Sequence, residues 1–191
     1  MTDATSEPGQ LRLRYSALSD LGRYRWTVPI LAFLVTHGGG RFVHMADSMG
    51  IPRESLSRTL EAAMTAGWVV RNSGHGHPQR PDYVLTAAGA RVGGGCRAVI
   101  LSQAAAGLPP DALTRWSLPV IRLVADGHSR FNAIARGIEG VTPRALTASL
   151  KALVVHDVLH RRVTDGFPPA SDYALTGRGM MLADALESLA G

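Results

Sequence analysis

The fold is decided by one stretch of the chain, RFNAIARGIEGVTPRALTASLKALVVHDVLHRRVTDGFPPASDYALTGRG, at positions 130–179. Its first part, 131–138, carries apolar residues at helical spacing and leads into a glycine turn. In the longer segment that follows, Leu146, Leu150 and Leu153 recur at the spacing that places side chains on one face of a helix. The stretch therefore opens with two predicted helices joined by a short turn.

The remainder of the stretch predicts a β-hairpin. Residues with β propensity occupy 158–163 and 171–175, and the turn formers Asp165-Gly166 and Pro168-Pro169 lie between them. Helix, turn, helix and a two-stranded wing make up a winged helix-turn-helix. In that arrangement the second helix of the pair can enter the major groove of DNA.

The same pattern occurs earlier in the chain, at an offset of about ninety residues. The matching pairs are Arg25-Trp26 with Arg115-Trp116, Pro29 with Pro119, Arg41-Phe42 with Arg130-Phe131, Leu56 and Leu60 with Leu146 and Leu150, Asp82-Tyr83 with Asp172-Tyr173, and Gly89 with Gly179. The predicted fold class is therefore mainly α with small β wings, formed by two tandem winged helix-turn-helix domains.

The repeat also predicts the domain organisation. We expect the first winged helix at 22–106, a short linker at 107–110 and the second winged helix at 111–191. Residues 1–21 are expected to form a tail and a helix that brings Leu11, Leu18 and Leu21 to one face. This helix packs either on the body of the protein or against a second chain, and the sequence leaves both arrangements open.

Within each repeat the second helix is expected at 42–49 or 131–138, and the third at 52–66 or 143–156. Thr86 and Thr176 are candidate N-caps of the last helix. In the first repeat that helix runs through Gly93-Gly94-Gly95, which we expect to weaken or kink it. Asp111 is expected to cap the helix after the linker.

Three motifs in the second repeat resemble the HxlR family of bacterial transcriptional regulators. They are the Arg-Phe-Asn at 130–132, the Gly-Val-Thr-Pro-Arg-x-Leu-Thr at 140–147 and the closing Tyr-x-Leu-Thr-x-x-Gly at 173–179, with Trp116 upstream. The resemblance implies a non-enzymatic protein that binds duplex DNA. It also implies a homodimer for ordinary family members, whereas this chain already carries two reading helices.

The amino-acid composition is consistent with an anionic partner and also bears on where the protein is located. The net charge is +5 and the isoelectric point about 10.1, and Lys151 is the only lysine. The arginine bias suits recognition of phosphate and guanine, and a GC-rich genome would produce the same bias. No apolar run is long enough to span a membrane and the first ten residues lack a signal-peptide core, so we expect a cytoplasmic, nucleoid-associated protein.

The expected DNA-reading surface lies on the third helix of each repeat, opposite its leucines. In the second repeat this face carries Arg144, Thr147, Ala148 and Lys151, which suit contacts with guanine, phosphate and the thymine methyl group. The matching face of the first repeat carries Glu54, Ser57, Arg58 and Glu61. The alternative is an ordinary solvated helix face.

Charge is unevenly divided between the repeats. Residues 22–106 have a net charge of +5, against +1 for residues 111–191. We therefore expect the first repeat to contribute mostly phosphate contacts through its wing, and the second most of the base reading. The full set of predicted DNA-binding residues is Arg41, Arg53, Ser57, Arg58, Arg71, His75, His77, Arg80, Arg130, Arg144, Thr147, Ala148, Lys151, Arg161 and Arg162. Arg41 and Arg130, at the starts of their second helices, are expected to clamp phosphate.

Other residue patterns do not indicate chemistry. His75 and His77 lie two apart but lack an evident third ligand, so we expect no metal site and no cofactor. The glycine runs lack the endings of phosphate-binding loops. Thiol sensors of the resembled family are expected to hold their cysteine before the first tryptophan, so Cys96 is interpreted as a half-buried structural thiol.

The predicted function is a sequence-specific regulator of transcription, acting as a repressor on double-stranded DNA. A homodimer through the N-terminal and C-terminal helices would present four reading helices. The alternative function is a winged-helix scaffold for protein interaction in a chromosome or transcription complex, without base reading. The operator, the regulated genes and the existence of a small-molecule effector are left open by the sequence.

Overall fold

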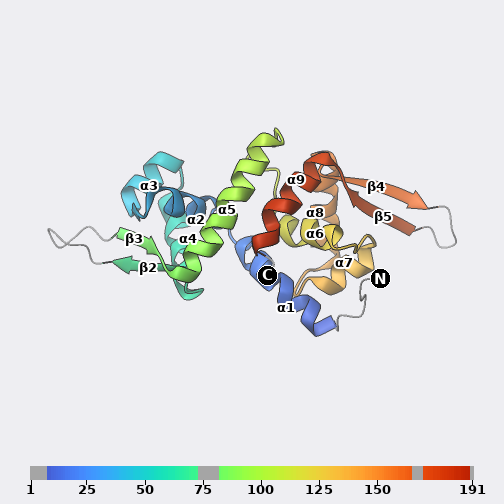
Figure 1. Cartoon of the computed structure of the whole chain (residues 1–191), viewed down its shortest axis with the longest axis horizontal. Helices are drawn as coiled ribbons and strands as arrows, with labels where there is room; N and C mark the ends of the chain where they lie inside the picture. The colour runs from blue at the N-terminus through green and yellow to red at the C-terminus, as the bar shows by residue number, and fades with distance from the viewer. Residues whose placement is uncertain (1–7, 73–81, 165–169, 190–191) are drawn as a thin grey trace. The chain divides into compact units, whose positions relative to one another are not determined.

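A computed structural model describes residues 8–72, 82–164 and 170–189 of the chain (Figure 1). The described chain folds into two compact units. The N-terminal unit comprises Tyr24–Leu101, and the C-terminal unit comprises Met1–Arg23 together with Ser102–Gly191. The described part is mainly helical with two small antiparallel sheets, which confirms the predicted fold class.

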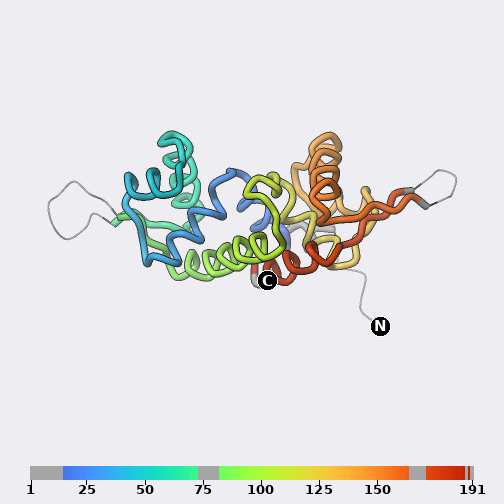
Figure 2. The backbone as a smooth tube through the Cα atoms, turned by 90° about the horizontal axis from the view of Figure 1, so that it is seen from above, coloured from blue at the N-terminus to red at the C-terminus, as the bar shows by residue number. Residues whose placement is uncertain are grey.

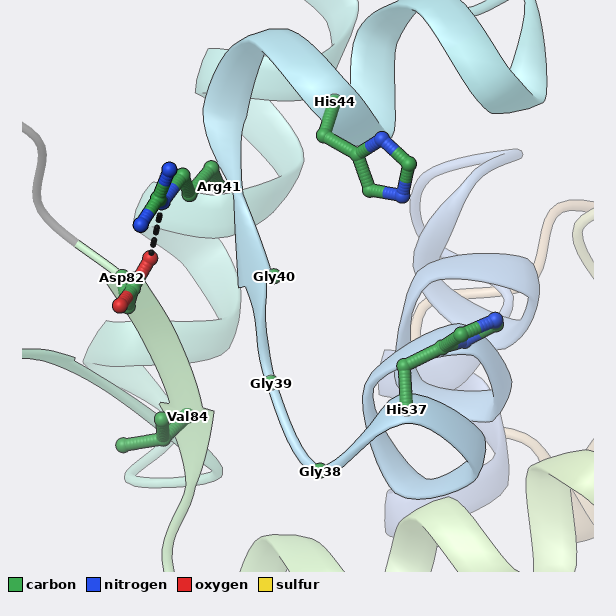
Figure 3. A pocket seen from close by; sticks show the side chains of 8 residues that line it. All are labelled: His37, Gly38, Gly39, Gly40, Arg41, His44, Asp82 and Val84. Carbon is green, nitrogen blue, oxygen red and sulfur yellow. Dashed lines mark hydrogen bonds and ion pairs between the residues drawn. The ribbon is translucent and has the colours of Figure 1, made fainter.

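The N-terminal unit follows the winged-helix order. Its elements are α2 (Thr27–His37), β1 (Gly40–Arg41), α3 (Phe42–Met49), α4 (Arg53–Thr65), β2 (Val69–Asn72), β3 (Asp82–Leu85) and α5 (Ala87–Ala105), whose last turn passes into the other unit. Its sheet has the order β1-β3-β2, with Gly40 opposite Tyr83 and Arg71 also opposite Tyr83. The left-handed Gly38 ends α2, and Gly38–Gly40 lead into Arg41 (Figure 3).

The C-terminal unit repeats this order and adds a helix from the start of the chain. Its elements are α1 (Pro8–Leu21), α6 (Ser117–Ala125), α7 (Phe131–Gly137), α8 (Pro143–Val155), β4 (Leu159–Thr164), β5 (Ala170–Leu175), α9 (Gly177–Leu186) and a 3-10 turn at Glu187–Leu189. Strands β4 and β5 pair from Leu159 opposite Leu175 to Thr164 opposite Ala170. Figure 2 shows α8 and α9 on opposite sides of this unit.

The predicted cores form in both units. Leu146, Leu150 and Leu153 of α8 are no more than 1% exposed, and Leu56 and Leu60 of α4 are buried in the same way. Because the leucines take the inner face of each helix, the residues between them are forced towards solvent. Packing alone therefore decides which face of the third helix is available to a partner.

The closing motif of each repeat builds the junction between the wing and the last helix. Thr176 caps α9 by accepting a hydrogen bond from the Gly179 amide, at 3.2 Å, and Thr86 does the same for Gly89 at 2.9 Å. A Cβ on Gly179 would lie 2.2 Å from the Val158 carbonyl oxygen. The glycine is therefore required by close backbone approach, and both predicted threonine caps are confirmed.

Three local expectations are wrong. Helix α5 continues through Gly93-Gly94-Gly95 without interruption, and Gly93 packs closely on α2, where a Cβ would lie 3.1 Å from the Leu31 carbonyl oxygen and 3.2 Å from Val35. Asp111 caps no helix, since it lies in a turn and α6 begins only at Ser117. Cys96 is fully buried rather than half-buried, and this burial raises the pKa of its thiol to about 12.

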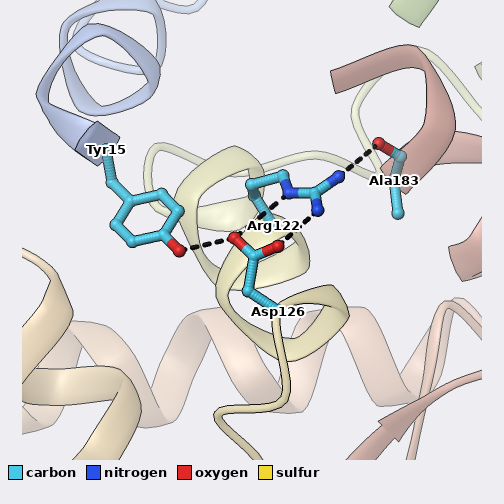
Figure 4. Close-up of polar contacts among 4 residues, drawn as sticks. All are labelled: Tyr15, Arg122, Asp126 and Ala183. Atoms are coloured by element: carbon cyan, nitrogen blue, oxygen red, sulfur yellow. Dashed lines mark hydrogen bonds and ion pairs between the residues drawn. The ribbon is translucent and has the colours of Figure 1, made fainter. Parts of the chain in front are cut away.

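Helix α1 packs on α6 and α7 of the C-terminal unit, where Tyr15, Leu18 and Leu21 are at most 1% exposed. The Tyr15 hydroxyl donates to Asp126 Oδ2 at 2.5 Å (Figure 4). Asp126 also pairs with Arg122, whose Nη1 donates to the Ala183 carbonyl of α9 at 3.3 Å. The hydrogen bond to Asp126 raises the pKa of Arg122 above its usual value. This network ties α1, α6 and α9 together.

We predict that Tyr15→Phe lowers the free energy of unfolding of the C-terminal unit by about 1.5–3 kcal/mol, the usual contribution of a hydrogen bond to a charged group. The measurement is urea unfolding followed by Trp116 fluorescence, in a chain carrying Trp26→Phe and Trp68→Phe. Asp20→Asn, on the exposed side of the same helix, is the control and should change stability little. Equal effects of the two variants would contradict the role of the network.

Candidate nucleic-acid interface

Helix α8 is built to present its outer face. Thr142 caps it by accepting from the Ala145 amide at 3.2 Å, and Pro143 occupies its first turn, where a missing amide donor costs least. Its inner face also buries Ser149, whose hydroxyl lies 3.1 Å from that of Thr114. Position and orientation of the helix are thus fixed by its cap, its leucines and one buried polar contact.

The outer face of α8 carries the four residues expected from the sequence, and all four are exposed. Arg144 and Lys151 form no salt bridge with any described residue, so both cations remain available to an anionic partner. The Thr147 hydroxyl donates to the Pro143 carbonyl at 2.8 Å, which leaves its methyl group and a lone pair for contacts. With Ala148, this face combines two free cations with small side chains that permit close approach.

The same face of α4 is electrostatically different. Glu54 forms an ion pair with Arg58 at 2.5 Å, and Ser57 donates to Glu61 at 3.0 Å. In each pair the two residues are four positions apart on the helix, so Glu54 offsets the charge of Arg58, while Glu61 accepts from an uncharged hydroxyl. Arg53 is exposed at the start of the helix. The α4 face therefore presents fewer unpaired positive charges to an anionic partner than the α8 face does.

A second basic position recurs at the start of the second helix in each unit. Arg41 Nε lies 3.3 Å from Asp82 Oδ1, and Arg130 Nε lies 3.4 Å from Asp172 Oδ1. Asp172 also accepts from the Ser129 hydroxyl at 3.2 Å. Both arginines remain more than half exposed, but each is tethered to the base of its wing by a carboxylate.

Sequence reasoning assigned no role to these two aspartates. The signal was present, because the Arg-Phe and Asp-Tyr pairs recur together in both repeats. What the sequence does not show is that the short segment before the second helix lies beside the wing strand, as in the bridge between Arg130 and Asp172. The aspartates orient the arginine heads and offset part of their charge.

The remaining predicted residues lie on the wings. Arg71 on β2 and Arg161 and Arg162 on β4 are exposed, and Arg161 donates twice to the Ser171 hydroxyl, at 3.0 and 2.7 Å. His75, His77 and Arg80 fall outside the described residues. Among the residues that are described, no group of three histidine, cysteine or acidic side chains is placed to hold a metal ion.

None of the helices within residues 8–72, 82–164 and 170–189 has the length and apolar character needed to cross a bilayer.

Comparison with known proteins agrees with this geometry. Residues 21–100 and residues 113–191 each match the HxlR-like helix-turn-helix family. The chain belongs to this family. Its two matches confirm the tandem duplication, and they place the protein among helix-turn-helix proteins rather than enzymes.

Three relatives illustrate the similarity, each an uncharacterized helix-turn-helix-type transcriptional regulator. One from Methanothermobacter thermautotrophicus is 33% identical over 75 residues, covering 39% of this chain and 57% of the relative. YtfH of Escherichia coli is 31% identical over 77 residues, covering 40% and 61%. YybR of Bacillus subtilis is 34% identical over 68 residues, covering 36% and 54%. The chain thus spans little more than half the length of the curated relatives it matches.

Proposed function

We propose that this protein is a sequence-specific, double-stranded-DNA-binding regulator of transcription that acts as a repressor. The observation that carries the proposal is the outer face of α8, where Arg144 and Lys151 stand exposed and form no salt bridge with the described residues. In winged helices this helix is the usual reading element. Arginine there can bind guanine through two hydrogen bonds, and lysine can bind guanine or phosphate.

The two units contribute unequally in this proposal. The C-terminal unit reads bases through α8, while the N-terminal unit holds the DNA backbone through basic groups outside α4. A single chain then acts as a built-in pair of unlike readers on an operator whose two halves differ. Bound at a promoter on the nucleoid, the protein would repress transcription by excluding RNA polymerase. A promoter–reporter fusion, measured in cells with and without the protein, tests whether it represses or activates.

We expect Arg144→Glu and Lys151→Glu each to weaken binding to a selected operator about tenfold or more, since each removes a contact of about 1–3 kcal/mol and adds repulsion. The matched reversals Glu54→Lys and Glu61→Lys occupy the equivalent positions of α4 and should change affinity much less. Fluorescence anisotropy with a labelled duplex measures both pairs. Equal losses in the two pairs would refute the unequal division of roles.

Affinity should also fall steeply with salt, because each phosphate contact releases counterions from the duplex. For six or more phosphate contacts the loss between 50 and 200 mM salt is on the order of a thousandfold. Arg71→Ala and Arg162→Ala should each lower the slope of log affinity against log salt by about one, whatever the DNA sequence. A slope near zero for the unaltered protein would argue against DNA binding.

A protein-interaction scaffold is the second candidate function. The self-paired acidic face of α4, with its Glu54–Arg58 and Ser57–Glu61 contacts, favours it locally. Passing the purified protein over immobilised genomic DNA fragments distinguishes the two functions, because a DNA-binding regulator would be retained and a scaffold would not.

A further inference from the structure

The N-terminal unit contains an open cavity of about 510 Å³ between the end of α2, the start of α3 and strand β3. It is lined by His37, Gly38, Gly39, Gly40, Arg41, His44, Asp82 and Val84. Figure 3 shows the glycine segment crossing the site, with the two histidines on one side and the Arg41–Asp82 pair on the other. The lining thus places basic side chains on both sides of a backbone that carries no side chains of its own.

Both histidine rings contact Phe33. The His37 ring stacks on Phe33 with a centroid distance of 4.1 Å, and its Nδ1 lies 2.9 Å from the Phe33 carbonyl oxygen. The His44 ring packs against the same phenylalanine at 6.0 Å. With Nδ1 of His37 on the carbonyl, Nε2 is the ring nitrogen left for a ligand. Phe33 therefore organises two exposed imidazoles at one wall of the cavity.

Charge in the cavity favours an anion. Among the described lining residues the one carboxylate is that of Asp82, which is paired with Arg41 at 3.3 Å on the side away from the histidines. Three of the described lining residues, Arg41, His37 and His44, have side chains of the basic type, against the single carboxylate of Asp82. Imidazolium and guanidinium groups form short, charge-assisted hydrogen bonds with oxyanions.

The second repeat keeps the arginine and the aspartate but not the histidines. At the positions aligned with Phe33, His37 and His44 it has Leu123, Gly127 and Ala133. The histidine wall is therefore particular to the N-terminal unit, the unit whose α4 face carries two carboxylates and whose Arg58 is already paired with one of them. A general requirement of the winged-helix fold would not explain this difference.

We propose that this cavity is a binding site for a phosphate-type oxyanion, with His37 and His44 as its ligands and Arg41, oriented by Asp82, as a supporting charge. The phosphate comes either from the DNA backbone or from a free phosphorylated molecule. The first source rests on the proposed function, and the oxyanion site itself does not. With DNA bound, the site anchors the N-terminal unit to the backbone in place of its α4 face.

The direct test is NMR of the histidine rings in the full chain, titrated with inorganic phosphate against chloride at equal ionic strength and slightly acid pH. The resonances of His37 and His44 should shift saturably, and that of His156 in the C-terminal unit should not. His37→Gln and His44→Gln assign the resonances, and each should weaken phosphate binding at the remaining ring. Absence of saturable shifts, or equal shifts at all histidines, would overturn the site.

A second measurement separates the two sources of phosphate. If the backbone of DNA occupies the cavity, the double variant His37→Gln/His44→Gln should bind a duplex about five- to twentyfold more weakly at low salt, whereas His156→Gln should bind as the unaltered protein does.

Saturable phosphate shifts with unchanged DNA affinity would support the site and assign it to a free phosphorylated molecule. Phosphate shifts in a protein that binds no DNA would refute the proposed function while supporting the site. Normal DNA binding without phosphate shifts would refute the site alone.

Discussion

Each unit depends on burying one apolar face of its third helix. In α8 this face is Leu146, Leu150 and Leu153, which are sealed against α6 and strand β4. Fully burying such leucines contributes about 1.5–3 kcal/mol each, so rotating the helix by even one residue would be costly. The face turned to solvent is fixed by this burial. Arg144 and Lys151 are exposed to solvent because the leucines on the opposite face of α8 are buried.

Burial of the equivalent leucines in α4 leaves a different set of side chains exposed to solvent. The buried leucines recur, but the exposed positions hold carboxylates that pair with Arg58 and Ser57 on their own helix. The duplication has therefore kept the scaffold while the two outer faces differ. Basic character in the N-terminal unit lies elsewhere, at Arg41, at the histidine wall of the cavity and on the wing strand.

Much of the fold could be predicted from local patterns. The helical spacing of the leucines, the threonine caps and the β-prone wing segments depend on residues near one another in the chain, and these features recur in both repeats. Thr86 and Thr176 were predicted correctly for this reason. The expectation for Asp111 failed because this residue lies in a turn ahead of α6, and the expectation for the glycine run failed because α5 continues through it, with Gly93 packed closely on α2.

Contacts between distant residues could not be predicted in this way. Tyr15 and Asp126 are 111 positions apart, and nothing in either local sequence indicates that α1 completes the C-terminal unit. The Arg41–Asp82 and Arg130–Asp172 pairs, and the packing of two histidines on Phe33, likewise depend on the folded arrangement. The outer face of α8 could be predicted because it is what remains once the core residues are removed.

We propose that the two units, built on one scaffold, present unlike surfaces to DNA, with base reading concentrated on α8. The most direct measurement is selection of bound duplexes from a randomised DNA pool by the full chain, followed by sequencing. We expect an asymmetric motif whose sequence information lies mainly in one half. A palindromic motif with equal information in both halves, or no enrichment of any sequence, would contradict it.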